Sequence, residues 1–344
     1  MLITYVRSSS YNNYDYCQMQ YFLTYVLGWR SESGKKADMG TMAHKVMEIL
    51  AGLKKFQQDN PRKKYLEIVD DKCGKVRVSK DDLYTSDFVD EITQLAIQKY
   101  AEGSSHKFYR KDRQVVRDTV ETFLTHSDGM FDPRKRDIVD AEPHFDITID
   151  EPWAEYDYTM PDGVRIHGNL SIKGTVDLIT EAGNGVYEST DWKTGMRKDW
   201  ATGEIKDFWK LCGDPQLRIY HYALSKMYPD IDQFIMTIYF IKDGGPYTLA
   251  FTKDDIEDTK QMIKNRFEEI RDSNVPQLKK SWKCTKICHF GKNEHPSGII
   301  NPDTGAPFTI CEFVAKKIRR KGMNVSLAED ISPGHQFDYY EAPG

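Results

Sequence analysis

Apolar residues recur at two different spacings along this chain of 344 residues. Up to about residue 133 they lie three or four positions apart, which is typical of one face of an α-helix. From residue 141 onward, short runs rich in β-branched and aromatic residues alternate with turn residues, and such runs predict strands. The pattern therefore predicts a mixed α/β protein with a helical first part.

Four helices are expected in that first part. The first has Ser10 as its cap and an apolar face made of Tyr14, Cys17, Tyr21, Phe22 and Tyr25. The second carries Gly40 and His44. Two more, over 82–100 and 114–126, lie in a highly charged region that begins at the break Asn60-Pro61. Since this region contains no catalytic constellation, it is interpreted as a helical insertion.

Strands are expected in the second part over 145–149, 156–160, 172–179, 186–193, 234–241 and 247–251. The residues between the third and fourth of these, 181–185, are rich in types that tolerate positive φ, which predicts a hairpin. A helix is expected to begin at Pro215 with Asp214 as its cap, and another covers 253–271.

The hairpin carries the candidate chemistry. Side chains two apart on a strand share a face, so Asp191 and Lys193 point the same way, and Asp177 lies on the neighbouring strand. Carboxylates suit a divalent cation such as Mg²⁺, which also keeps waters and phosphate oxygens as ligands. Lys193 would serve the attacking water or neutralise charge at phosphorus. The set fits metal-assisted hydrolysis of a phosphodiester.

The register of the hairpin tests this interpretation. A two-residue Asn184-Gly185 loop would pair Asp177 with Trp192 and send the two acids to opposite faces. We therefore predict an odd-numbered loop or a β-bulge, which would set Asp177 opposite Asp191.

Composition adds limits. A net charge of −5 argues against a protein that coats nucleic acid, but basic residues gather locally at 107–113, 134–136, 197–198, 279–280 and 316–321. No apolar run approaches the length of a membrane span, and the first ten residues lack the order of a signal peptide. We expect a cytoplasmic protein with mostly reduced cysteines.

Three segments together resemble a known family. Gly174-Thr-Val-Asp177, Asp191-Trp-Lys193-Thr-Gly and Gln216-Leu-Arg-Ile-Tyr220 resemble the PD-(D/E)XK nuclease superfamily in its RecB-like branch, which includes iron–sulfur-containing RecB/AddB-type exonucleases. Gly40-Thr-Met-Ala-His44 and Glu142 extend the resemblance upstream. Five motifs in the family's order cover most of the chain.

The resemblance implies a restriction-endonuclease-like α/β core, with a central mixed β-sheet flanked by helices and a helical insertion. It divides the chain into N-terminal helices of the nuclease domain (1–51), the insertion (52–140), the nuclease core (141–275) and a cysteine-containing C-terminal segment (276–344). The insertion is expected to form one wall of a DNA channel.

The resemblance also assigns roles. It implies that the metal is held by His44, Asp177, Asp191 and the main-chain carbonyl of Trp192, although His44 by itself also fits a structural histidine. Glu142 and Lys193 join the acids in catalysis. Substrate contacts are expected from Gln216, Tyr220, Arg197 and Lys198.

The function implied is a Mg²⁺- or Mn²⁺-dependent DNA nuclease, an exonuclease acting on single-stranded ends in recombination, repair or replication. The chain has no G-x-x-x-x-G-K-[ST] motif, so a helicase would be a separate partner. The alternative is a catalytically inactive subunit that binds DNA ends or serves as a scaffold.

Four cysteines need a separate interpretation. Many RecB-like nucleases bind an iron–sulfur cluster through one cysteine before the core and three after it, and this order is matched by Cys17, Cys284, Cys288 and Cys311. The gaps of three and twenty-two residues between the last three are wider than in the family. A [4Fe-4S] cluster, a zinc ion completed by Cys17, His289 or His295, and free thiols therefore all stay open.

Overall fold

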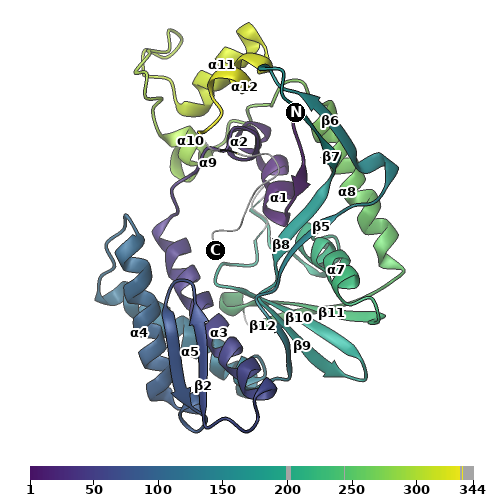
Figure 1. Ribbon diagram of the computed structural model, residues 1–344. Helices are drawn as coiled ribbons and strands as arrows, with labels where there is room; N and C mark the ends of the chain where they lie inside the picture. Colours follow the sequence, from purple (N-terminus) through teal and green to yellow (C-terminus); the bar gives the residue numbers. More distant parts are fainter. Residues whose placement is uncertain (199–202, 244, 334, 336–344) are drawn as a thin grey trace.

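A mixed five-stranded sheet forms the centre of the computed structural model, which describes residues 1–198, 203–243, 245–333 and 335 (Figure 1). The strands run in the order β12-β11-β10-β9-β4. β10 and β11 are parallel and the other neighbours are antiparallel. Their bounds are β4 (Ile138–Ala141), β9 (Leu178–Gly183), β10 (Val186–Lys193), β11 (Gln233–Phe240) and β12 (Gly245–Thr252).

Alternate residues of these strands enter two different cores, as the period of two in a strand requires. Leu178, Trp192 and Tyr239 pack with α3 (Lys35–Asp59), α4 (Ser86–Gly103) and α5 (Arg110–Gly129). Ile179, Phe234 and Ile238 pack on the other side with α7 (Pro215–Met227) and α8 (Asp255–Asp272). The sheet is therefore buried on both faces and flanked by helices, as predicted.

A second, smaller sheet joins the start of the chain to the middle. Its order is β1-β8-β5, with β1 (Tyr5–Val6), β5 (His144–Thr148) and β8 (Ser171–Thr175), and the hairpin of β6 (Glu155–Thr159) and β7 (Arg165–Asn169) follows β5. The prediction of one strand over 172–179 was wrong, because β8 and β9 belong to different sheets. Val176 and Asp177 form the junction between them.

The first predicted helix is also interrupted. The chain forms α1 (Ser8–Tyr16), α2 (Gln18–Tyr21) and a π-helical turn (Phe22–Val26), with the extended Cys17 between the first two at φ −165° and ψ 112°. Ser10 is not the cap: it lies inside α1 and its hydroxyl accepts a hydrogen bond from the Arg7 amide at 2.9 Å. The break turns the Cys17 side chain toward the C-terminal segment.

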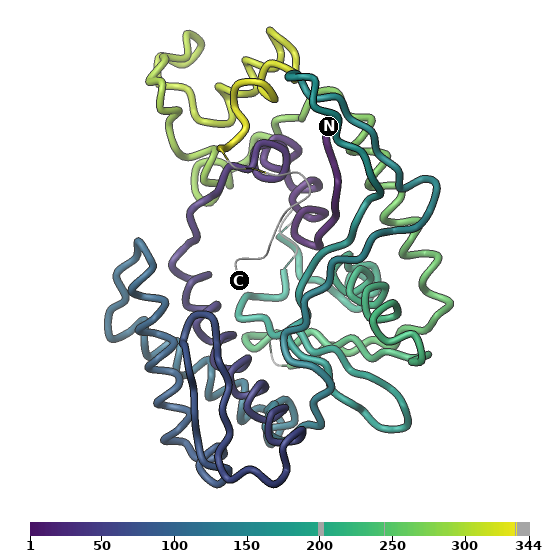
Figure 2. Tube along the Cα trace, viewed as in Figure 1, coloured from purple at the N-terminus to yellow at the C-terminus, as the bar shows by residue number. Residues whose placement is uncertain are grey.

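The region predicted as a helical insertion contains a β-hairpin as well as helices. α3 continues through the expected boundary at residue 52, and β2 (Tyr65–Asp70) pairs with β3 (Gly74–Ser79) between α3 and α4. Figure 2 shows the hairpin and α3, α4 and α5 as one lobe. α5 begins four residues earlier than predicted and loses helical geometry at His126, Ser127 and Asp128.

The remaining elements are short. They are α6 (Phe208–Cys212), α9 (Trp282–Lys286), α10 (His289–Lys292), α11 (Ile310–Lys321), α12 (Met323–Glu329) and the 3₁₀ turns Asp82–Tyr84, Pro133–Lys135, Pro152–Ala154 and Ile241–Asp243. Across the residues that the structure describes, no helix has both the length and the apolar character needed to cross a membrane.

Candidate active site

The hairpin of β9 and β10 contains the predicted bulge. Asn184 and Gly185 form a two-residue loop with φ values of 55° and 72°, the positive pair that a type I′ turn requires. Val186 pairs with Gly183, but the register then shifts and Thr190 pairs with Leu178. Continued by one residue, the shifted register sets Asp191 opposite Asp177. The bulge therefore places both acids on one side, as the register argument predicted.

Asp191 lies at the end of β10 and is only 3% exposed. The Lys193 ammonium is 2.7 Å from its Oδ2, which confirms that the two side chains share a face. The amide Nε2 of Gln216 donates a hydrogen bond of 2.7 Å to its Oδ1. Burial alone would lower the pKa of Lys193, but Asp191 and Asp177 outweigh it and raise this pKa above its usual value. Lys193 is therefore a cation held in place by acids.

Gln216 reaches Asp191 because of how α7 begins. Asp214 caps the helix by accepting a 2.9 Å hydrogen bond from the Gln216 amide, and Pro215 fills the first helical position, as predicted. Tyr220, one turn later, is buried, and its ring meets Phe145 edge-on at 5.8 Å. Burial raises the pKa of Tyr220, and Asp191 adds to the effect. Both residues of the predicted helical motif therefore border the acids.

Asp177 lies at the junction between the two sheets. Its Oδ2 accepts a 2.8 Å hydrogen bond from the Trp192 amide and lies 3.5 Å from Nδ1 of His44. Burial raises the pKa of Asp177 to about 6; His44 opposes this shift and Asp191 adds to it. Two acids therefore share a partly buried place in which an additional cation would be stabilised.

His44 approaches from α3, on the other side of the sheet end. Its ring contacts Phe123 and Trp192 edge-on, with centroid separations of 6.3 and 6.4 Å. Gly40, one turn before His44 on α3, faces the end of β10. A Cβ at Gly40 would lie 2.6 Å from Oγ1 of Thr194, so the glycine lets α3 approach the end of β10 closely.

Glu142 contacts the site through its backbone and through a second acid. Its amide donates a 3.1 Å hydrogen bond to the Asp177 carbonyl, and its backbone has the unusual φ of 52°. Its side chain hydrogen-bonds Glu48, one turn beyond His44. Burial raises the pKa of Glu48 to about 9; Glu142 adds to this shift and Lys45 opposes it. Sequence reasoning assigned Glu48 no role, although its spacing from His44 placed it on the same face of α3.

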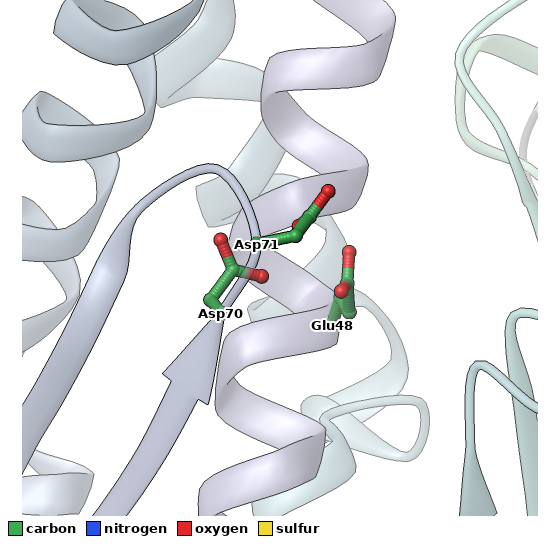
Figure 3. Close-up of side chains that lie close together, drawn as sticks. All are labelled: Glu48, Asp70 and Asp71. Atoms are coloured by element: carbon green, nitrogen blue, oxygen red, sulfur yellow. The ribbon is translucent and has the colours of Figure 1, made fainter. Parts of the chain in front are cut away.

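A cluster of three acids next to the site already contains a cation. The carboxylate oxygens of Glu48, Asp70 and Asp71 lie within 4.8 Å of one another, on α3 and at the end of β2 (Figure 3). The Lys45 ammonium contacts all three at 2.6 to 3.0 Å. His44, Asp177 and Asp191 do not form a group of that spacing, although all three are described. Lys45 therefore occupies the cluster that by spacing alone would suit a metal ion.

The two predicted cations beyond β10 differ. Arg197 is held by the protein: its amide hydrogen-bonds Asp243, and its guanidinium donates to the Lys206 carbonyl and stacks on the Tyr247 ring at 4.3 Å. Lys198 is exposed and forms a backbone bridge with Ile205. Lys198 can therefore reach a bound molecule more easily than Arg197.

The four singled-out cysteines come from segments that pack together. The Met19 amide donates to the Gln277 carbonyl at 3.1 Å, and the Cys288 thiol lies 3.6 Å from Oε1 of Gln20. Burial raises the pKa of the Cys311 thiol to about 11, with contributions from Cys288 and Cys17. In the described structure the four thiols do not all lie within 4.8 Å of one another.

Fold and site together define a class of protein. Two acids and a lysine at the end of a mixed sheet, with a histidine from a flanking helix, form the arrangement of a phosphodiesterase. The comparison with protein families gives the particular family: the chain belongs to the PD-(D/E)XK nuclease superfamily, whose model matches residues 8–292. The restriction-endonuclease-like fold and the class of nuclease, both predicted from the sequence, are thereby confirmed.

Relatives outside the family model are distant. No curated protein matches the chain. Among solved structures, a presumed exonuclease from Eubacterium rectale is 13% identical, with a TM-score of 0.38, and the match covers 91% of this chain and 93% of that one. The protein SSO0001 is 16% identical, with a TM-score of 0.25, and the match covers 59% of this chain and 78% of that one. These likenesses say nothing about substrate or polarity.

Proposed function

We propose that this protein is a metal-dependent exonuclease of the RecB-like branch that degrades single-stranded DNA from an end. The observation that carries the proposal is the approach of Asp177, at the junction of the two sheets, to the end of β10. Asp177 accepts a hydrogen bond from the Trp192 amide, and the Lys193 ammonium lies 2.7 Å from Asp191. A module that only binds DNA would have no need of two adjacent acids that repel both each other and the phosphate backbone.

The residues present fit a divalent cation. The carboxylates of Asp177 and Asp191 and the carbonyl of Trp192 offer the oxygen ligands that Mg²⁺ or Mn²⁺ prefers, and His44 adds a nitrogen 3.5 Å from Asp177. Burial raises the pKa of Asp177 and Asp191 adds to the shift, so a cation bound between the two carboxylates would stabilise their charged forms. A bound ion would polarise the phosphate and lower the pKa of the attacking water.

The protein's own residues would orient the reaction. Lys193 stays protonated, so it suits charge stabilisation on the phosphate better than proton abstraction. Gln216 holds Asp191 in one rotamer through Oδ1. Glu142, hydrogen-bonded to Glu48, would support the water or the ion from the α3 side.

Two exposed aromatic residues on the short helix that precedes α7 in the sequence support a single-stranded substrate. Trp209 is 78% and Phe208 53% exposed, and their rings meet edge-on at 5.4 Å on α6. In the sequence this helix lies between β10, which carries Lys193, and α7, which carries Gln216. Exposed aromatic rings stack on unpaired bases, with about 1–3 kcal/mol per base.

The test uses purified protein with end-labelled and circular single strands, in Mg²⁺ or Mn²⁺ and in chelator. We expect release of nucleotides from linear strands only, in the presence of metal only. Asp191→Ala and Lys193→Ala should each lower the rate by at least about a thousandfold with an unchanged circular dichroism spectrum.

A matched control is Asp157→Ala, because Asp157 forms an exposed ion pair with Arg165 on the remote β6–β7 hairpin. This variant should cleave like the wild type. Full cleavage by Asp191→Ala would refute the site. Tight binding to DNA ends without hydrolysis under every metal condition would instead establish the alternative of an inactive end-binding or scaffold subunit.

The finer family features are proposed on the same basis. The four thiols come from N-terminal and C-terminal segments that pack together, which supports an iron–sulfur cluster, with a single zinc ion as the alternative. Cys17, Cys284, Cys288 and Cys311 would hold it and thereby fasten the C-terminal segment to α1 and α2. The protein would act in the cytoplasm in recombination, repair or replication, with a separate helicase supplying the single strands.

A further inference from the structure

A strongly basic surface lies at the start of α3 and α5, away from the acids. It consists of the exposed residues Lys36, Lys107, Tyr109, Arg110, Lys111 and Arg113. Together, segments 33–38 and 104–113 contain six lysines and arginines but only two acids, in a chain whose net charge is −5. We call these six exposed residues the basic surface.

Both acids of these segments are bound within the protein. Asp112 is buried, pairs with the Lys35 ammonium at 2.6 Å and accepts a 2.8 Å hydrogen bond from the Tyr109 amide. Asp38 accepts a 2.9 Å hydrogen bond from the Ser104 hydroxyl. These contacts fasten the connection between α4 and α5 to the start of α3 (Figure 1). Asp38 and Asp112 therefore hold the two segments together, while the cations of the basic surface are exposed to solvent.

The placement of the cations is unfavourable for the helices themselves. Lys36 lies in the first turn of α3, and Arg110, Lys111 and Arg113 lie in the first turn of α5. The start of a helix carries partial positive charge, so cations there cost about 0.3–1 kcal/mol each. Each helix has one acid in the same turn, Asp38 in α3 and Asp112 in α5, but both acids are engaged within the protein. The four exposed cations therefore remain available to a ligand.

Two helices, α3 and α5, connect the basic surface with the region of the acids. α3 and α5 meet at Lys35 and Asp112 and meet again at His44 and Phe123, whose rings are 6.3 Å apart. Nine residues separate Lys35 from His44 on α3, which corresponds to roughly 14 Å at 1.5 Å per residue. A chain of a few nucleotides spans that distance.

Tyr109 gives the surface more than charge. Its ring is 61% exposed and lies 5.0 Å from the Lys35 ammonium, which holds it among the cations. An aromatic ring surrounded by lysine and arginine is the combination that binds single-stranded nucleic acid, through phosphates and an unstacked base.

We propose that the basic surface binds the backbone of a single-stranded nucleic acid whose scissile phosphate lies at Asp177 and Asp191, with Tyr109 stacked on a base. This inference rests on the proposed nuclease function for the position of the scissile phosphate. The binding itself is independent of catalysis.

The test measures affinity in chelator, where no hydrolysis is expected. Binding of a fluorescently labelled oligothymidine is followed by anisotropy over a range of salt concentrations. The triple variant Lys107→Ala, Arg110→Ala and Lys111→Ala should bind at least about tenfold more weakly at 0.1 M salt. Its slope of log K against log salt should be smaller by about 2, since each phosphate contact to a single strand contributes roughly 0.7.

The chain provides a matched control at the end of α11, where Arg319, Arg320 and Lys321 form an equally charged exposed run. Their triple alanine variant should keep the affinity and the slope. The first variant should melt at the same or a higher temperature, since it removes cations from a helix start. Unchanged affinity and slope in a folded first variant would overturn the proposal.

Two further measurements separate this inference from the proposed function. Tyr109→Ala should weaken binding to oligothymidine but not to an abasic strand of the same length; equal losses of affinity on both strands would contradict the stacking role.

A small aryl phosphodiester that fills only the acid site should be hydrolysed equally by the wild type and the triple variant. Failure of both proteins to hydrolyse it would contradict the nuclease proposal and leave the binding result standing.

Discussion

At the scale of single residues, burial controls the charge of the acids. Asp177 and Glu48 both lie in partly buried places where another acid is close, and in both the pKa is raised. Lys193 and Lys45 are surrounded by acids and stay protonated. The site therefore contains cations fixed in position and carboxyl groups whose charged form is disfavoured by burial and by a neighbouring acid.

A buried histidine outside the site predicts how stability depends on pH. Burial lowers the pKa of His221 to about 4; Asp255 opposes the shift and Arg218 adds to it. An unfolded histidine titrates near 6.5, so the stabilisation is complete above that pH and is lost as the pH falls toward 4. Between pH 7.5 and 5 this residue should cost about 2 kcal/mol of unfolding free energy.

His221→Phe removes the titration and keeps an aromatic ring against Phe234 and Phe251. The free energy of unfolding should be measured with denaturant at pH 7.5 and at pH 5. Its decrease between the two pH values should be smaller by about 2 kcal/mol in this variant than in the wild type. The control is His167→Phe, at an exposed position, which should show the same decrease in unfolding free energy as the wild type. An identical loss in all three proteins would contradict the assignment.

At the scale of elements, close approach between α3 and β10 holds the site together. Gly40 leaves room for Thr194, whose Oγ1 would lie 2.6 Å from a Cβ at that position. Gly40→Ala should therefore displace His44 from Asp177 and lower the cleavage rate at least about tenfold. Thr194→Gly in the same chain should restore most of the rate. Failure of this rescue would show that the contact does not set the helix position.

The short helix α6 makes a prediction about substrate. Trp209→Ala should raise KM for single-stranded DNA about five- to tenfold, as the loss of roughly 1 kcal/mol or more of stacking requires, with little change in kcat. Trp282→Ala is the control, since Trp282 is 65% exposed on α9 in the C-terminal segment. Equal KM values for the two variants would exclude α6 from substrate binding.

At the scale of the whole molecule, two hydrophobic cores lie on opposite faces of the five-stranded sheet, and the C-terminal segment forms a third region. The C-terminal segment packs against α1 and α2, and the N-terminal ammonium of Met1 donates to the carbonyls of Ile270, Arg271 and Ser273. The first and last parts of the fold are therefore joined far from the acids. The cysteines lie at the junction of the N-terminal helices and the C-terminal segment.

If these cysteines hold a cluster, Cys17→Ser and Cys288→Ser should remove iron and visible absorbance from anaerobically purified protein. They should also lower Tm by several degrees, because a bound group stabilises only the folded chain. Cys212→Ser, a cysteine outside the group, should change neither. Wild-type protein without iron or zinc would leave the four residues as ordinary thiols.

The sequence alone determined much of this protein, because strand and helix periods are local properties. It predicted that Asp191 and Lys193 share a face, that Asp214 and Pro215 begin a helix, and that an odd-numbered loop or a bulge sets the two acids opposite each other; the structure has the bulge. Each of these depends on residues within one hairpin or one helix turn.

Features that depend on contacts between distant segments of the chain were decided only by the tertiary structure. The division of the expected strand 172–179 between two sheets follows from pairing with β1 and β5 on one side and β4 and β10 on the other. The hydrogen bond between Glu48 and Glu142 and the contact of Gly40 with Thr194 join residues far apart in the chain. Periodicity carries no information about such pairs, since packing of whole elements brings them together.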